Sequence, residues 1–235
     1  MEVPSVVGWM LFAIGAFGVG RVVADPLCDG DRWLRAGLAI PLVLVILGVA
    51  SYSLGMFRYG RGTAMVAWAL PALLAVAISR RRGYPSLGRA DHTVAAVFLI
   101  AGMLMLMLRA SDPSIDAIGG EKFLDYSLLR SILRAEMLPP VDPWFAGEGV
   151  RYYYGGQLVV ASIALVLDVR PAVAFNLGVV FTYATVVATA AAIGASISVR
   201  AITGAVGSAV AVGLASNLMP GTRLLVGMLP EPFRE

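Results

Sequence analysis

The sequence predicts an all-α protein, a polytopic transmembrane helical bundle of about seven spans with an interfacial amphipathic helix in a long extracytoplasmic loop. Of its 235 residues, 59% are hydrophobic and 14% are charged. A soluble domain of ordinary composition carries about 25% charged residues. The mean hydropathy is +0.82, and several apolar runs are long enough to cross a bilayer. A soluble globular domain is therefore excluded.

The predicted spans follow the apolar runs of the chain. They lie at residues 3–24, 36–56, 63–79, 93–109, 154–168, 171–195 and 200–219. The first run begins after Glu2, without a basic region before it, and is long enough to span, so we expect a transmembrane helix and no cleavable signal. Pro41 and Pro71 are tolerable inside spans because neighbouring helices satisfy the freed carbonyl groups. The run at 154–168 is short, so it either crosses together with the tyrosines before it or lies buried among its neighbours.

Arginines predict the orientation of these spans. The densest basic cluster of the chain consists of Arg80, Arg81, Arg82 and Arg89. Basic residues concentrate in cytoplasmic loops, so we expect this connection inside and the long loop 110–153 outside the cell membrane. The chain then divides into a three-helix transmembrane region at 1–92 and a second transmembrane region at 93–235, whose functional loop is 109–157.

Composition also limits the partners and cofactors. The net charge is +3, and the basic residues are scattered over the loops, so the lipid bilayer is the expected partner and nucleic acid is not. Cys28 is the single cysteine and His92 the single histidine. An internal disulfide and a His/Cys metal cluster are therefore both excluded for this chain.

The long loop contains the predicted amphipathic helix. Seven of the fifteen acidic residues fall between positions 112 and 148. Helical periodicity runs from Glu121 to Leu138, where Pro139 and Pro140 end it. One face of this helix is apolar and consists of Leu124, Leu128, Leu129, Ile132 and Leu133. Arg130, Ser131 and Arg134 occupy the opposite face, which is the pattern of a helix that lies in the membrane interface.

Two carboxylates of this helix, Glu121 and Asp125, stand at i and i+4 on the apolar side, where a merely solvated acid is not expected. Such a pair could hold a divalent cation, or one member could act as a general base beside the lipid. Alternatively, both acids simply complement the helix dipole in the first turn. Both interpretations remain open from the sequence.

Several neighbouring residues are candidates for substrate binding. Lys122 is the one lysine against seventeen arginines, which suggests a role that arginine fills poorly, although chance also explains it. Tyr152, Tyr153 and Tyr154 precede a span, as in an aromatic belt. Because successive helical positions differ by about 100°, at least one tyrosine should face the protein or the loop. Trp144 could stack on a sugar or anchor the interface.

Three polar residues complete the list of substrate-binding candidates, Asp142, Arg151 and Gln157. Asp142 opens an Asp-Pro-Trp turn, and Arg151 and Gln157 flank the tyrosines. Asn176 lies inside a predicted span, where an amide most often provides a hydrogen bond between helices.

Residues 109–183 resemble the Chlor_Arch_YYY family of highly hydrophobic uncharacterised membrane proteins. The resemblance rests on Arg109 with Asp112-Pro113, on Glu121-Lys122-Phe123-Leu124-Asp125, on Pro139-Pro140-Val141-Asp142-Pro143-Trp144 and on Tyr152-Tyr153-Tyr154-Gly155-Gly156-Gln157. The chain departs from the family at Phe123-Leu124, which replaces a Pro-Met pair, and at Gly156-Gln157. Family members are several hundred residues longer, so the chain resembles their N-terminal portion.

The family layout is similar to that of GT-C-type glycosyltransferases, which use lipid-phosphate-linked sugars. The resemblance implies that Asp125 or Glu121 is the catalytic base or a metal ligand. It also implies that Lys122 or Arg151 neutralises a leaving lipid phosphate. The donor would be a polyprenyl-phosphate sugar, and a divalent cation is the candidate cofactor.

Two other functions remain open. One is a non-catalytic or truncated membrane module that needs a partner chain with further helices. The other is a transporter, which ranks last because a transporter carries ionisable groups within its spans and these spans are nearly free of them.

Overall fold

Helices dominate this protein because a backbone inside lipid must satisfy its own N–H and C=O groups, which an α-helix does. The computed structural model describes residues 2–115, 122–145 and 147–215. Over these residues the elements are α1 (Val3–Ala24), η1 (Asp25–Leu27), α2 (Arg32–Gly55), α3 (Arg61–Arg82), α4 (Arg89–Ser111), α5 (Lys122–Arg134), α6 (Gly155–Leu167), α7 (Pro171–Ile197) and α8 (Ala201–Ala215). The described part contains an isolated β-bridge but no named strand. The all-α class is confirmed.

Five helices of the described part are long and apolar enough to cross a membrane, namely α1, α2, α3, α4 and α7. They contain or nearly contain the predicted runs 3–24, 36–56, 63–79, 93–109 and 171–195. The remaining runs correspond to the shorter apolar helices α6 and α8. Residues 216–219 of the last run lie outside the described residues. The protein is thus a multi-pass membrane protein.

The helix α6 does not cross the bundle. At the end of α4, Arg109 donates to the side-chain oxygen of Asn176 near the start of α7, with a distance of 2.8 Å from Nε. At the other end of α7, Ser196 donates to Asp31 before α2. α4 ends and α7 begins at the same end of the bundle, so α6 returns to the end from which it started. Of the two alternatives for 154–168, the structure favours burial among neighbours.

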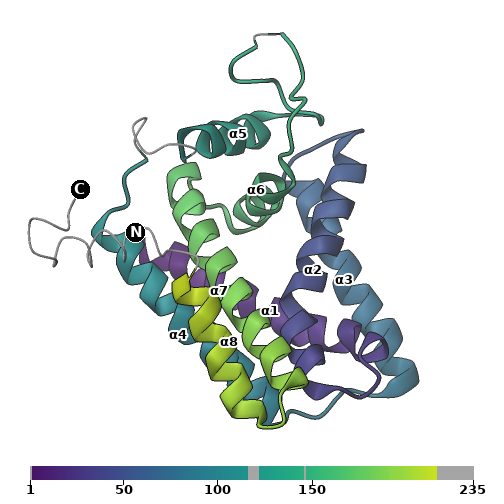
Figure 1. Cartoon of the computed structure of the whole chain (residues 1–235). Helices are drawn as coiled ribbons and strands as arrows, with labels where there is room; N and C mark the ends of the chain where they lie inside the picture. The colour runs from purple at the N-terminus through teal and green to yellow at the C-terminus, as the bar shows by residue number, and fades with distance from the viewer. Residues whose placement is uncertain (1, 116–121, 146, 216–235) are drawn as a thin grey trace, which may run out of the picture.

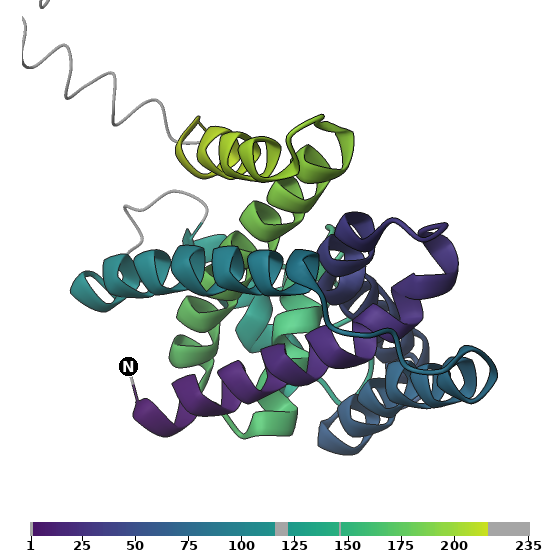
Figure 2. The same cartoon turned by 90° about the horizontal axis from the view of Figure 1, so that it is seen from below.

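We call the end of the bundle that carries α5 and residues 56–60 the loop end, and the opposite end the ion-pair end. Figure 1 shows α5 across the loop end, above α6 and the start of α7. Residues 25–31 and 83–88 lie together at the ion-pair end, as the predicted topology requires. Which end faces the cytoplasm stays a prediction. In Figure 2, α8 lies at the edge of the bundle beside α7.

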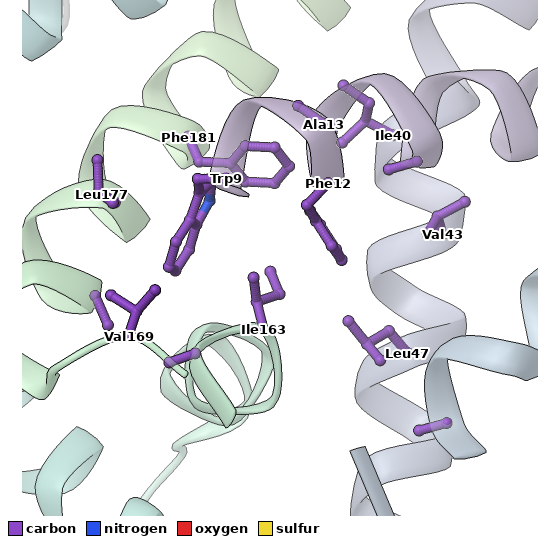
Figure 3. Close-up of a cluster of buried hydrophobic side chains, with 14 of the residues drawn as sticks. Trp9, Phe12, Ala13, Ile40, Val43, Leu47, Ile163, Val169, Leu177 and Phe181 are labelled. Atoms are coloured by element: carbon purple, nitrogen blue, oxygen red, sulfur yellow. The ribbon is translucent and has the colours of Figure 1, made fainter. Parts of the chain in front are cut away.

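The largest core cluster joins α1, α2, α3, α6 and α7. In Figure 3, Ile163 of α6 lies among Trp9 and Phe12 of α1 and Leu47 of α2. The ring of Phe12 stacks at a tilt on Trp68, with centroids 4.5 Å apart, and meets Phe181 edge-on. Helices from both predicted regions therefore share one core. The division at residues 92 and 93 stays a prediction.

Small residues allow the helices to approach closely, as in other membrane bundles. A Cβ atom at Gly20 would lie 1.9 Å from the carbonyl oxygen of Ala39, so α1 and α2 could not meet there with any larger residue. At Gly194 a Cβ atom would lie 2.4 Å from the carbonyl oxygen of Gly204, which is the crossing of α7 and α8.

A buried ion network holds the ion-pair end together. Asp91, 1% exposed, accepts hydrogen bonds from Arg21 Nε at 2.6 Å and from its own helix start at Gly88. Arg35 approaches the same carboxylate at 3.5 Å and also donates to Asp25 at 3.2 Å. The network joins α1, η1, α2 and α4. Sequence reasoning did not identify it.

We expect the Asp91→Asn variant to lose about 3–5 kcal/mol of stability, because two buried guanidinium groups lose the carboxylate that they share. The loss can be measured by unfolding in mixed detergent micelles. Glu148→Gln is the control: it breaks the exposed pair of Glu148 and Arg151 and should cost less than about 1 kcal/mol. Similar losses in both variants would contradict a structural role for the network.

Candidate functional site

A cleft at the loop end combines a polar end with apolar walls. We call it the Asp125 cleft, and its volume is about 460 Å³, within the range of about 300–1,000 Å³ for small-molecule sites. It is lined by Met105 of α4, by Asp125 and Leu129 of α5, by Gly156, Gln157 and Val160 of α6, and by Phe175, Gly178, Val179, Thr182 and Tyr183 of α7. Four helices therefore build this site.

The apolar face of α5 positions Asp125. Leu128, Leu129 and Ile132 are buried against the bundle, with 2%, 1% and 0% of their surfaces exposed. Asp125 precedes Leu129 by four residues, so it projects on the same side of the helix. Its carboxylate accepts a hydrogen bond of 2.8 Å from Nε2 of Gln157. The partly buried carboxylate is thus oriented toward the cleft by an amide from another helix.

The predicted partnership of Glu121 with Asp125 lies outside the described residues, because the description of α5 begins at Lys122. Among the described residues, no group of three His, Cys, Asp or Glu side chains could hold a metal ion. Asp125 can supply one carboxylate ligand, and a divalent cation needs several more oxygen ligands. The roles of Asp125 and Glu121 as catalytic base or metal ligands stay predictions.

A second polar feature lies one helical turn from the cleft. Arg109 follows Met105 by four residues on α4, so the two share a face. Both Nε and Nη2 of Arg109 donate to Oδ1 of Asn176, which is 3% exposed. The amide nitrogen of Asn176 donates to the carbonyl oxygens of Pro113 and Ala172. The prediction that Asn176 joins helices is confirmed.

The Arg109 guanidinium is therefore held in place by a neutral amide and not by a carboxylate. The structure assigns it no ion pair within the described part of the chain. A positive charge fixed in this way retains its attraction for an anionic ligand. Sequence reasoning noted Arg109 only in a motif and did not include it among the site residues, since its partner is 67 positions away.

Lys122 lies near the same end of α4. Hydrogen bonds from Ser114 hold the pKa of Asp112 below its ordinary value, and the nearby charges of Lys122 and Arg109 lower it further, despite a small opposing effect of burial. The start of α5 thus brings the single lysine into the neighbourhood of Arg109. Its assignment to substrate binding stays a prediction.

The three tyrosines separate into two environments. Tyr154 is 8% exposed and packs in the core beneath α5, which confirms that at least one tyrosine turns inward. Burial raises its pKa, and the neighbouring Tyr52 adds to the effect. Tyr152 and Tyr153 are exposed, with stacked rings 4.0 Å apart, and the Tyr152 hydroxyl donates to that of Tyr153. A substrate-binding role for the three tyrosines stays a prediction.

The remaining candidates lie away from the Asp125 cleft. Asp142 caps its own turn by accepting from the backbone N–H groups of Trp144 and Phe145. Trp144 is 49% exposed and meets the ring of Phe123 edge-on. Arg151 pairs with Glu148 at 3.4 Å, and both side chains are exposed. The structure gives these three residues local partners, and their assignment to substrate binding stays a prediction.

A chain of hydroxyl groups connects the turn between α2 and α3 to α6. It was not predicted from the sequence. The Tyr59 hydroxyl shares a hydrogen bond of 3.2 Å with Ser162 of α6, in which either oxygen can be the donor, and Ser162 is bonded to Ser51 of α2 at 3.0 Å. The backbone N–H of Tyr59 also donates to the carbonyl oxygen of Glu136. No local sequence pattern predicts these hydrogen bonds, because Tyr59 and Ser162 are 103 positions apart.

Close packing strengthens this connection. The N–H of Leu138 donates to the carbonyl oxygen of Gly55 at 2.8 Å, and a Cβ atom at Gly55 would lie 2.6 Å from the Leu138 side chain. The helix α5 consequently ends at Arg134, short of the predicted Leu138. Long-range bonding of Leu138 replaces the last helical turn that the sequence suggested.

Comparisons with known proteins give one result. Residues 42–235 match the model of the family described as uncharacterized membrane protein (DUF2298). No curated protein and no solved structure matches the chain.

Burial raises the pKa of Tyr59 from 10.0 to about 12, although the bond with Ser162 opposes the shift. The buried, neutral Tyr59 hydroxyl therefore contributes fully to the stability of the folded protein below pH 10.0. This contribution should be lost as the pH rises toward about 12. Tyrosinate absorbance of the wild type minus that of Tyr59→Phe should therefore titrate with a midpoint near 12. A difference that titrates as an exposed tyrosine does would contradict the burial of this hydroxyl.

Replacement of Asn176 by leucine should cost about 1–3 kcal/mol, because Arg109 and two carbonyl oxygens lose their partner. Unfolding in mixed micelles measures the loss. Thr185→Val is the matched control on α7, since among the described residues the Thr185 hydroxyl bonds to Phe181 of its own helix alone, and its removal should cost less than about 1 kcal/mol. If both variants are equally stable, Asn176 does not join the helices energetically.

Proposed function

The chain belongs to this family of uncharacterized membrane proteins, and we propose that it is a GT-C-like glycosyltransferase module that uses a lipid-phosphate-linked sugar at the Asp125 cleft. The observation that carries the proposal is the partly buried carboxylate of Asp125 at the polar end of a cleft with apolar walls. The similarity to the Chlor_Arch_YYY family, and through it to GT-C enzymes, is part of the same proposal.

The lining of the cleft suits an amphiphilic substrate. Met105, Val160, Phe175 and Val179 provide apolar surface from α4, α6 and α7, which is the surface that a polyprenyl chain requires. Asp125 and Gln157 provide the polar end, where the sugar and its acceptor would bind. Such a division between apolar walls and a few convergent polar groups is typical of small-molecule sites.

In the proposed reaction, Asp125 is the general base. It takes the proton from the acceptor hydroxyl, and the acceptor oxygen forms a bond to the anomeric carbon of the sugar. The bond from that carbon to the phosphate oxygen breaks, and the lipid phosphate leaves with both bonding electrons. Gln157 orients the carboxylate through its hydrogen bond.

The leaving phosphate gains negative charge, which nearby cations stabilise. Arg109 and Lys122 are the candidates. Arg109 lies at the end of α4, the helix that contributes Met105 to the cleft, and Lys122 at the start of α5 lies near that end of α4. The hydrogen bond to Asn176 orients the guanidinium of Arg109. With the orientation that the arginines predict, the transfer takes place on the extracytoplasmic side.

The test compares two variants in sugar transfer from polyprenyl-phosphate sugars to hydroxyl acceptors. Asp125→Asn keeps an oxygen that accepts from Gln157 but removes the base, so the rate should fall by about a hundredfold or more. Asp168→Asn neutralises a carboxylate at the other end of α6, where φ is 57°, a conformation that asparagine tolerates. This control should retain the wild-type rate.

Two results decide against the proposal. Equal transfer rates in Asp125→Asn and Asp168→Asn would remove Asp125 from the reaction. A wild-type protein that is folded but inactive with every polyprenyl-phosphate sugar would favour the alternative of a membrane module that needs a partner chain.

A further inference from the structure

A second hollow lies on the other side of α5 and shares no lining residue with the Asp125 cleft. One wall is a polar stripe on α5 formed by Ser127, Arg130, Ser131 and Arg134. These positions follow the i, i+3, i+4, i+7 spacing, so they form one continuous strip of the helix surface. The segment 135–143 forms the other wall. We call this hollow, of about 630 Å³, the arginine groove.

The second wall is fixed by hydrogen bonds on both of its sides. Ser131 donates to the carbonyl oxygen of Val141 across the groove floor. The N–H of Val150 donates to the carbonyl oxygen of Pro140, and the N–H of Asp142 donates to that of Glu148, so the segment pairs with residues 148–150, which lead back toward α6. The bonds of Tyr59 and Leu138 described above tie its other side to the turn between α2 and α3. The groove is therefore preformed and does not depend on a ligand for its shape.

The groove contains two arginines and two acids, and the arginines form no ion pair with these acids. Among the described residues, no ion pair involves Arg130 or Arg134. Two carboxylates also line the groove, those of Glu136 and Asp142. Asp142 directs one oxygen to the backbone of its own turn, and neither carboxylate lies within 4.0 Å of a guanidinium nitrogen. The guanidinium N–H groups of Arg130 and Arg134 are therefore not occupied by these acids.

The position of Arg130 leaves its donors available. Its guanidinium carbon lies 5.9 Å from the centroid of the Tyr126 ring, and that ring in turn packs edge-on against Phe175 of α7. Attraction to the ring face steadies the guanidinium without using its N–H groups. Planar guanidinium groups present several N–H donors in a fork that matches a phosphate group.

We propose that the arginine groove binds a phosphate group, with Arg130 and Arg134 as its two ligands. The serines of the stripe already donate to backbone carbonyl oxygens, so they shape the groove and the arginines supply the donors. The phosphate belongs either to a free phosphorylated molecule or to the headgroup of a lipid. This site is independent of Asp125 and of the proposed transfer reaction.

The first arm of the test titrates the purified full chain in uncharged detergent with inorganic pyrophosphate, with binding measured by calorimetry. The variant Arg130→Gln/Arg134→Gln should bind about tenfold more weakly or worse, because it loses the charge-assisted hydrogen bonds of both forks. Arg80→Gln/Arg81→Gln removes the same charge from exposed positions at the ion-pair end and should bind as the wild type does.

The second arm identifies a lipid source. The same proteins are placed in nanodiscs of phosphatidylcholine with phosphatidylglycerol, and retained lipids are measured by native mass spectrometry. Phosphatidylglycerol that is retained by the wild type and by the Arg80/Arg81 variant, but lost from the Arg130/Arg134 variant, supports the proposal with a lipid headgroup. Pyrophosphate binding with the same pattern supports it with a free phosphate compound.

Identical behaviour of the two double variants in both arms would overturn the proposal, since attraction would then follow net charge alone. If the glutamine variant does not fold, Arg130→Lys/Arg134→Lys replaces it. Lysine keeps the charge and the favourable interaction with the end of α5 but lacks the fork. Phosphate binding by this variant at wild-type strength would contradict the role of the two guanidinium groups.

Discussion

The short buried helix α6 is the constraint on which the loop end depends. It has 13 residues, too few to cross a bilayer of about 30 Å. Its polar groups must therefore find hydrogen-bond partners inside the protein. Ser162 meets the hydroxyls of Tyr59 and Ser51, and Gln157 meets Asp125. Leu158 and Ala161 receive the apolar face of α5. Because α6 ends within the bundle, it provides both the surface on which α5 packs and part of the lining of the Asp125 cleft.

The arginines at the two ends of the bundle differ in whether they form ion pairs. At the ion-pair end, Arg21 and Arg35 share Asp91 and Asp25, so buried charges compensate one another. At the loop end, Arg109, Arg130 and Arg134 have no carboxylate partner within the described residues. Desolvated charges are costly unless they are paired. Paired charge therefore holds helices together at the ion-pair end, whereas Arg130 and Arg134 at the loop end are exposed and keep N–H donors that no carboxylate occupies.

Local sequence patterns were sufficient to predict part of the candidate site. The period of about 3.6 residues in α5 correctly placed Asp125 on the side of Leu129 and the arginines on the other side. One of the three tyrosines, Tyr154, turns inward as predicted, but the three precede α6, which begins at Gly155, so a helical step of about 100° is not the reason. Local patterns could not identify Gln157 as the partner of Asp125 or Asn176 as the partner of Arg109, because those bonds join different helices.

The sequence by itself determined the class of the protein, the positions of five long spans and the amphipathic nature of α5. These properties follow from composition and from short-range periodicity, which lipid enforces along each segment separately. Only the tertiary structure decided that α6 turns back, that Asp91 joins three helices and that segment 135–143 closes a groove against α5. Each of these depends on the direction in which one helix meets another, and residues far apart along the chain set that direction jointly through packing.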